Sequence, residues 1–181
     1  VREESLLSDF FEDTIIEIKG DDNNRIDNPI TFLKERQLLS RASFEYLNIP
    51  ANHSIDLTDK EQRQIEETFE IPKRVIESIS RNTLRTAEII KRIKSLVNKE
   101  GKISVIVFCP NLESSKLINI FLQFDGIKSD HIDGATPIPQ RESIIQSFKE
   151  NNINVLCNYE VLSTGFDAPK TDCVFVARPT L

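Results

Sequence analysis

The sequence predicts an α/β domain in which helices cover both faces of a parallel β-sheet. The second half of the chain holds four short runs rich in β-branched residues, at 103–109, 128–132, 153–157 and 173–177. Helical patterns fill the gaps between the first three runs, and strands that alternate with helices are typical of doubly wound parallel sheets. The 181 residues, 39% of them hydrophobic, suffice for one compact core but are too few for two. We therefore expect a single domain over 1–181, with a mixed lead-in over 1–100 and a core over 101–181.

The first half of the chain predicts shorter elements. Pro29 indicates a helix start, because proline lacks the N–H group that a first helical turn leaves unpaired. Thr58 and Glu61 have the spacing of a capping box, and Pro72 indicates the start of a further helix. The expected elements, in chain order, are a strand at 14–19, an acidic turn at 20–28, a helix at 29–37, a strand at 44–49 and helices within 58–80.

An amphipathic helix with a basic face is predicted over 82–98. Its apolar positions, from Thr86 to Val97, recur at intervals of three and four. The other face holds Arg85, Lys91, Arg92, Lys94 and Lys99. The net charge of −6 argues against a nucleic-acid partner, but residues 71–102 carry 9 basic and 3 acidic side chains. A solvated helix face and a surface that faces nucleic acid both remain open.

Composition excludes several other classes of protein. The apolar runs are far shorter than the ~20 residues of a membrane span, and no signal-peptide pattern opens the chain, so we expect a cytoplasmic protein without a membrane partner. Cys109, Cys157 and Cys173 lie in or at the end of strand-like runs without CxxC spacing, which favours buried reduced thiols over metal ligands.

The start at Val1 and the end at Leu181, directly after a strand-like run, suggest a fragment of a longer protein.

Polar loops follow all four predicted strands. Ligands bind outside the carboxyl ends of the strands in open parallel sheets, so these loops are the expected site. Asn111 and Thr136 are expected to cap the helices that follow the first two strands, and helix starts of this kind suit phosphates. The chain lacks GxxxxGK[ST], GxGxxG, HExxH and GxSxG motifs, which disfavours a self-sufficient triphosphate site and a Rossmann-type cofactor enzyme.

The loop after the third strand carries the sharpest local signal, in Asn158 to Pro169. Gly165 permits a close backbone approach, and Asp167 offers a carboxylate that can accept a hydrogen bond from a ribose hydroxyl. Taken alone, a Gly-Phe-Asp sequence is no more than a turn.

The run HIDGATPIPQRESIIQSFKENNINVLCNYEVLSTGFDAPKTDCVFVARPT resembles the C-terminal lobe of superfamily 2 helicases. The likeness is strongest to the branch of type I and type III restriction translocases and XPB-like DNA repair helicases. In that family ISVIVFCPN resembles motif IV and LCNYEVLSTGFDAP resembles motif V. LKERQLLSRASFEYLNIP resembles the lead into the second lobe, so the likeness covers nearly the whole chain. The resemblance implies a RecA-like, three-layer fold without a phosphate loop of its own.

The resemblance also implies roles for particular residues. Gly165, Asp167 and Arg141 would face a nucleotide held between two lobes. The expected contacts with a nucleic-acid backbone are Pro110, Asn111, Ser114, Gly134, Ala135, Thr136, Asn158 and Ser163. For Arg141, a helix-surface salt bridge is the alternative.

In the family, motif VI and its arginine finger would follow the ARPT run, and the phosphate loop would lie in the first lobe. We therefore name no catalytic residue and no metal ligand in this chain. The interpretation is the second lobe of an ATP-dependent DNA helicase or translocase, with ATP and Mg²⁺ bound in the intact two-lobe enzyme, not tightly by this chain. Its expected partners are double-stranded DNA and the first lobe, and the chain alone is expected to be inactive. The alternative is a degenerate helicase-like lobe that serves as a docking module.

Overall fold

The computed structural model of the chain describes residues 26, 28–36, 42–47, 55–101, 104–162 and 166–179. The strand expected at 14–19 and most of the turn expected at 20–28 lie outside these residues. The chain divides into two compact units, Val1–Asn48 and Ile49–Leu181, and each is described by itself.

The first unit contains helix α2 (Pro29–Glu35). Asn28 caps it by accepting a hydrogen bond from the Thr31 N–H at 3.1 Å, and Pro29 occupies the first turn, as expected from the sequence. The strand expected at 44–49 is wrong for its described part, because residues 44–47 form no strand. Phe44 and Tyr46 are 86% and 91% exposed, so within the described part of the chain these aromatic residues pack against no strand or buried face.

Three helices open the second unit: α3 (Asp59–Thr68), α4 (Lys73–Ser80) and α5 (Thr83–Asn98). The predicted capping box is confirmed, since the Thr58 N–H donates to Glu61 Oε2 at 2.9 Å and the Glu61 N–H donates to Thr58 Oγ1. Pro72 precedes α4, and Asn82 caps α5. The helices expected within 58–80 and over 82–98 are thus confirmed.

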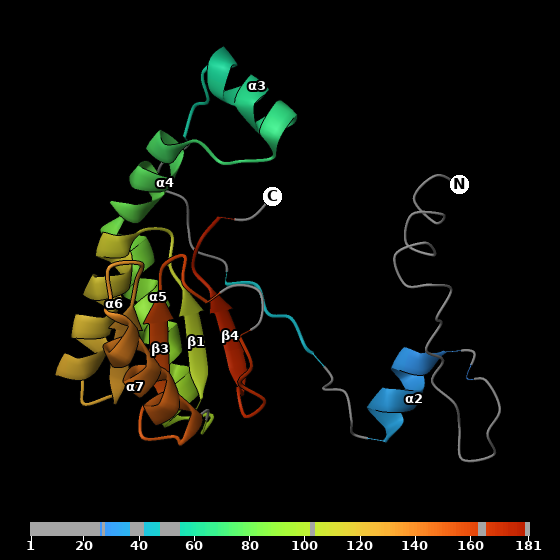
Figure 1. The fold of residues 1–181 in the computed structure, drawn as a ribbon. Coiled ribbons are helices and arrows are strands. Elements are labelled where there is room, and N and C mark those ends of the chain that lie inside the picture. Colours follow the sequence, from blue (N-terminus) through green and yellow to red (C-terminus); the bar gives the residue numbers. More distant parts are fainter. Residues whose placement is uncertain are drawn as a thin grey trace. The chain divides into compact units, whose positions relative to one another are not determined.

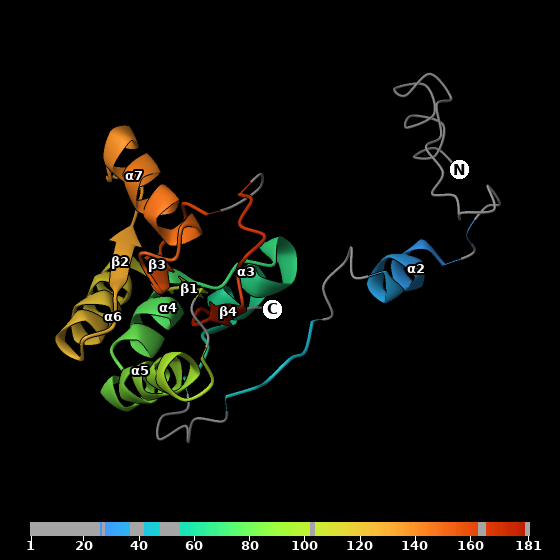
Figure 2. The same cartoon turned by 90° about the horizontal axis from the view of Figure 1, so that it is seen from below.

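The sheet contains four parallel strands in the order β2-β3-β1-β4 (Figures 1 and 2). They are β1 (Val105–Phe108), β2 (Ser129–Ile132), β3 (Val155–Asn158) and β4 (Cys173–Val176). Helix α6 (Leu112–Phe124) connects β1 to β2, and helix α7 (Ile138–Lys149) connects β2 to β3. All four strands therefore end at the same edge of the sheet.

Helices cover both faces of the sheet (Figure 2). Alternate residues along β1 point to opposite faces. Val105 and Val107 pack in a buried cluster with residues of α5 and α6, whereas Ile106 packs in a second cluster with Ile144 and Phe148 of α7. The predicted three-layer α/β fold is confirmed.

Two smaller observations complete the fold. Of the helices in the described part of the chain, none is long and apolar enough to cross a membrane. Cys109 and Cys157 are buried free thiols, as predicted, and Cys173 is half-buried. A hydrogen bond with Cys109 and complete burial raise the pKa of Cys157, so its thiol stays protonated and unreactive.

Candidate functional site

The four loops predicted to form the site meet at the carboxyl edge of the sheet. Main-chain hydrogen bonds link the strand ends there. The Cys109 N–H donates to the Asn158 carbonyl at 3.0 Å, which joins β1 to β3. The Tyr159 N–H donates to the Ile132 carbonyl at 3.2 Å, and the Ala177 N–H donates to the Phe108 carbonyl at 2.9 Å. Because the strands are parallel and in register, the polar residues that follow them are held on one rim.

The loop after β1 leads directly into α6. Asn111 Oδ1 accepts a hydrogen bond from the Ser114 N–H at 2.8 Å, so the predicted cap is confirmed. Pro110 and Ser114 are buried, whereas Asn111 is half-buried. Of the three residues expected in this loop, Asn111 therefore has the polar side chain nearest to solvent.

The turn after β2, residues 133–136, is organised by the carboxylate of Asp133. Its Oδ1 accepts from the N–H groups of Ala135 and Thr136, both at 2.8 Å, and from the Thr136 hydroxyl at 3.1 Å. Thr136 Oγ1 in turn accepts from the Asp133 N–H at 3.0 Å. This reciprocal bonding closes the turn and leaves Gly134 and Ala135 exposed on its outer side.

The role expected for Thr136 as a helix cap is wrong. Helix α7 begins at Ile138 after Pro137, which makes no side-chain cap. The Thr136 hydroxyl is bonded within the preceding turn, to Asp133. Pro137 occupies the N-cap position instead, and the Thr136 oxygen accepts from the Asp133 N–H rather than from an N–H of the first helical turn.

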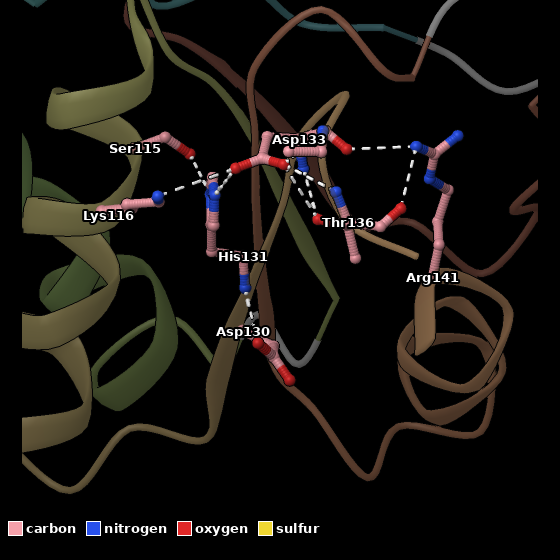
Figure 3. A network of polar contacts seen from close by, with 8 residues as sticks. Ser115, Lys116, Asp130, His131, Asp133, Thr136 and Arg141 are labelled. Atoms are coloured by element: carbon pink, nitrogen blue, oxygen red, sulfur yellow. Dashed lines mark hydrogen bonds and ion pairs between the residues drawn. The ribbon is translucent and has the colours of Figure 1, made fainter. Parts of the chain in front are cut away.

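From the α6 face, His131 connects the turn to a buried hydroxyl (Figure 3). His131 Nε2 lies 3.0 Å from Asp133 Oδ2, and His131 Nδ1 lies 2.7 Å from Ser115 Oγ. An ionised carboxylate only accepts, so Nε2 carries the proton, and in the neutral ring Nδ1 accepts from the Ser115 hydroxyl. Lys116 Nζ approaches the same Asp133 oxygen at 3.9 Å.

Ser115, His131 and Asp133 resemble a hydrolytic triad in composition but cannot act as one. The Ser115 side chain has no exposed surface, so no substrate reaches its hydroxyl. A triad nucleophile must lie against the bond that it attacks. The three residues therefore hold the turn in position.

From the α7 face, Arg141 holds the main chain of the same turn (Figure 3). One guanidinium nitrogen, Nη2, donates to the Asp133 carbonyl at 3.1 Å and to the Thr136 carbonyl at 3.3 Å. Its Nε is buried and has no hydrogen-bond partner among the described residues. The turn is thus bonded from both helical layers.

These hydrogen bonds set the electrostatics of the turn. The bond from His131, followed by those from the Thr136 hydroxyl and the two main-chain N–H groups, holds the pKa of Asp133 at about 2, below its usual 3.8. Burial of Asp133, which is 6% exposed, opposes this shift. The carboxylate is therefore ionised throughout the physiological range.

Comparison with known families decides the identity of the chain. The model of the helicase conserved C-terminal domain matches residues 88–180, more than half of the chain and all of the sheet. The chain belongs to this helicase family. The RecA-like fold class predicted from the motifs is confirmed with it.

Several relatives of this helicase domain are much longer proteins. A Schizosaccharomyces pombe protein named as a mitochondrial ATP-dependent helicase, irc3, is 38% identical over 80 residues, or 44% of this chain and 13% of that protein. The pre-mRNA-splicing ATP-dependent RNA helicase PRP28 of Meyerozyma guilliermondii is 25% identical over 138 residues, or 75% of this chain and 24% of that protein. The Pyrococcus furiosus Hef helicase domain superposes with a TM-score of 0.48 and 26% identity over 53% of this chain and 20% of that one. The chain spans less than a quarter of the length of these relatives.

In the helicase domain, the loop after β3 begins at the shared rim. Asn158 is 1% exposed; its Nδ2 donates to the Val107 carbonyl at 3.1 Å, and its Oδ1 accepts from the Leu162 N–H at 3.4 Å. Both bonds use the amide to hold the loop against β1. Ser163 and Gly165, also expected in the site, lie outside the described residues.

Asp167 and Arg141 form no hydrogen bond or ion pair with each other among the described residues. The neighbouring Phe166 packs near Lys149 at the end of α7, with Lys149 Nζ 5.9 Å from the ring centroid. Arg141 lies in the first turn of α7, eight residues earlier, or about 12 Å along a helix axis. Asp167 itself is exposed, so its carboxylate is open to a ligand from outside the domain.

The sequence placed Arg178 in the polar loop after the fourth strand but assigned it no contact. Arg178, which follows β4, lies with its guanidinium carbon 5.8 Å from the centroid of the Phe108 ring and is exposed at the rim. Arg85 of α5 donates from Nη2 to the Ala177 carbonyl at 2.5 Å, which ties α5 to the end of β4. The sequence indicates Arg178 by its position directly after the fourth strand-like run. The pairing of β4 with β1 then brings it beside Phe108.

The basic face of α5 is largely paired within the domain. Lys91 pairs with Glu88 at 3.1 Å and Lys94 with Asp125 at 2.8 Å. Arg92 pairs with Glu100, and Arg85 is bonded to a carbonyl. These contacts favour the interpretation of this face as an ordinary solvated helix surface over a nucleic-acid track.

Proposed function

We propose that this helicase domain is the second lobe of an ATP-dependent superfamily 2 motor, in which it supplies part of the nucleotide interface and part of the nucleic-acid track. The observation that carries the proposal is the 133–136 turn, bonded from both helical layers at the carboxyl rim. Gly134 and Ala135 face outward there, and such small residues let a phosphodiester backbone approach closely. Family membership supports the same assignment.

ATP and Mg²⁺ fit the described rim only in part. Asp167 offers an exposed acceptor suited to a ribose hydroxyl. The guanidinium of Arg141 bonds main-chain carbonyls, and no group of three potential metal ligands gathers among the residues that the structure describes. We therefore assign the triphosphate and its metal chiefly to a first lobe, with this domain closing on the nucleoside side.

We propose double-stranded DNA as the track, in a restriction or repair setting, because the motifs resemble that branch. Relatives of this domain are also named as RNA helicases, so RNA is the competing polymer. Contacts to the phosphate backbone predict weak base specificity and strong salt dependence with either polymer.

The test is ATP hydrolysis by the two-lobe protein, stimulated by a DNA duplex or by RNA. Asp167→Ala and Gly165→Val probe the nucleotide side. Gly134→Glu probes the track, and it should fold normally because a Cβ at Gly134 would meet nothing within 4 Å. Lys128→Gln is the matched control, since it makes the same change in net charge at an exposed position before β2.

The proposal expects different losses from the two groups of variants. Asp167→Ala and Gly165→Val should abolish stimulated turnover, with circular dichroism unchanged. Gly134→Glu should raise the polymer concentration that gives half-maximal stimulation by about tenfold, the effect of roughly 1.4 kcal/mol. Stimulation by RNA alone would overturn the choice of DNA. A folded wild-type enzyme that never hydrolyses ATP would make the domain a docking module.

A further inference from the structure

A groove lies between α5 and α6 of the second unit, and its lining includes no residue of the 133–136 turn. Its volume is about 670 Å³. Its lining combines serine, threonine and asparagine side chains with three lysines and with four apolar residues, Ala87, Ile90, Leu117 and Phe121. Neither the expected nucleotide contacts nor the expected nucleic-acid contacts lie in it.

Helix α6 is apolar on two faces, and only one of them faces the sheet. Ile118 and Leu122 are buried against the strands. A second stripe with the same helical spacing remains exposed: Leu117 43%, Ile120 60%, Phe121 47% and Phe124 88%. Contiguous exposed apolar surface of this kind marks an interaction site.

The charges of the groove define the partner that fits it. Lys91, Lys94 and Lys99 all line the groove, and no acidic residue does. Lys94 already binds a carboxylate, that of Asp125, at 2.8 Å. The groove thus combines apolar side chains with three lysines.

We propose that this groove binds an acidic amphipathic helix of a partner protein. Apolar residues of such a helix at i, i+3, i+4 and i+7 would pack on Leu117, Phe121 and Ile90, and its flanking glutamates would pair with Lys91 and Lys99. A polynucleotide fits less well, because Phe121 is the one aromatic side chain among the lining residues on which a base could stack. The site is independent of the proposed motor function.

The test starts with a phage-displayed library of 16-residue peptides selected on the full chain. The same selection is run on a groove variant, Lys91→Glu/Lys99→Glu, and on Phe121→Ser. The matched controls are Lys128→Glu, for an exposed lysine elsewhere, and Ile138→Ser, for an exposed apolar residue that is 67% accessible. The most enriched peptide and a fluorescent dT20 strand are then titrated against each protein by anisotropy, with folding checked by circular dichroism.

The proposal expects enriched peptides with acidic residues beside an apolar helical stripe. Their affinity should fall about tenfold or more with either groove variant and stay within about twofold with either control. The proposal would be overturned if no peptide were enriched on the wild-type chain over the groove variants. It would also be overturned if the enriched peptides were basic, or bound the groove variants as well as the wild type. A third contrary result is dT20 binding that Lys91→Glu/Lys99→Glu abolishes, with no peptide binding.

Discussion

Asp133→Asn measures how much the charge of one carboxylate stabilises the turn after β2. The buried carboxylate accepts hydrogen bonds from the N–H groups of Ala135 and Thr136 and from the His131 ring. Asparagine keeps an oxygen for the main-chain donors. Its amide nitrogen can donate to His131 Nε2 once the ring proton moves to Nδ1, which then donates to Ser115 Oγ. The substitution therefore removes the charge and leaves the shape of the turn accessible.

The size of the effect follows from the pKa of Asp133. That pKa is about 2 in the folded protein, against a usual 3.8. One pKa unit corresponds to about 1.4 kcal/mol, so the fold favours the ionised form by roughly 2 kcal/mol. Because the folded pKa is the lower one, this stabilisation is fully present above about pH 4 and is lost as the pH falls through about 2. We expect Asp133→Asn to lower the free energy of unfolding by about 2 kcal/mol at pH 7 and by about 1 kcal/mol at pH 3.

Urea unfolding at the two pH values is the assay. Asp167→Asn, the same change at an exposed position, is the control and should alter the free energy of unfolding by less than about 0.5 kcal/mol. The reasoning would be refuted if both substitutions had equal effects at neutral pH. It would also be refuted if the loss caused by Asp133→Asn were the same at both pH values.

Two further substitutions test how the rim is held. Asn111→Ala should lower the free energy of unfolding by about 1 kcal/mol, because α6 loses its cap. Asn111→Ser should restore most of that stability, and equal urea midpoints for all three proteins would contradict the prediction. Arg85→Met should cost about 1–2 kcal/mol and speed amide hydrogen exchange at Ala177, whose carbonyl Arg85 holds; unchanged exchange there would exclude the anchoring role.

The two central strands, β1 and β3, were predictable because their β-branched runs are buried on both sides, whereas β4 exposes Val174 and Val176. The run at 153–157 is an example: Val155 to Cys157 have no exposed surface, so every position had to be apolar. The run at 44–49 also contains strand-favouring aromatic and aliphatic residues but is exposed where described. Composition reports the tendency to extend, whereas a strand also requires a partner, and local sequence does not reveal whether one exists.

The location of the site was predictable, but its internal bonding was only partly so. Parallel strands place four loops on one rim whatever those loops contain. The alternation of strand residues puts His131 and Asp133 on the same face, a signal that the sequence contains and that was overlooked. Nothing local shows that Ser115, sixteen residues upstream, completes the chain of hydrogen bonds, because that contact depends on how α6 packs on the sheet.

The bonding of the 133–136 turn assigns different tasks to its two helical neighbours. On the α7 side, Arg141 bonds main-chain carbonyls, so it fixes where the backbone of the turn lies. On the α6 side, His131 and Ser115 bond the Asp133 side chain, so they fix the carboxylate that orders the N–H groups. A helix shift in either layer therefore alters a different set of donors and acceptors at the rim. Helix α6 also carries the stripe of the α5–α6 groove, beginning at Leu117 only two residues after Ser115. An occupant of the groove would accordingly bear on the same helix that orients the rim carboxylate, and any resulting coupling between the two sites must be reciprocal.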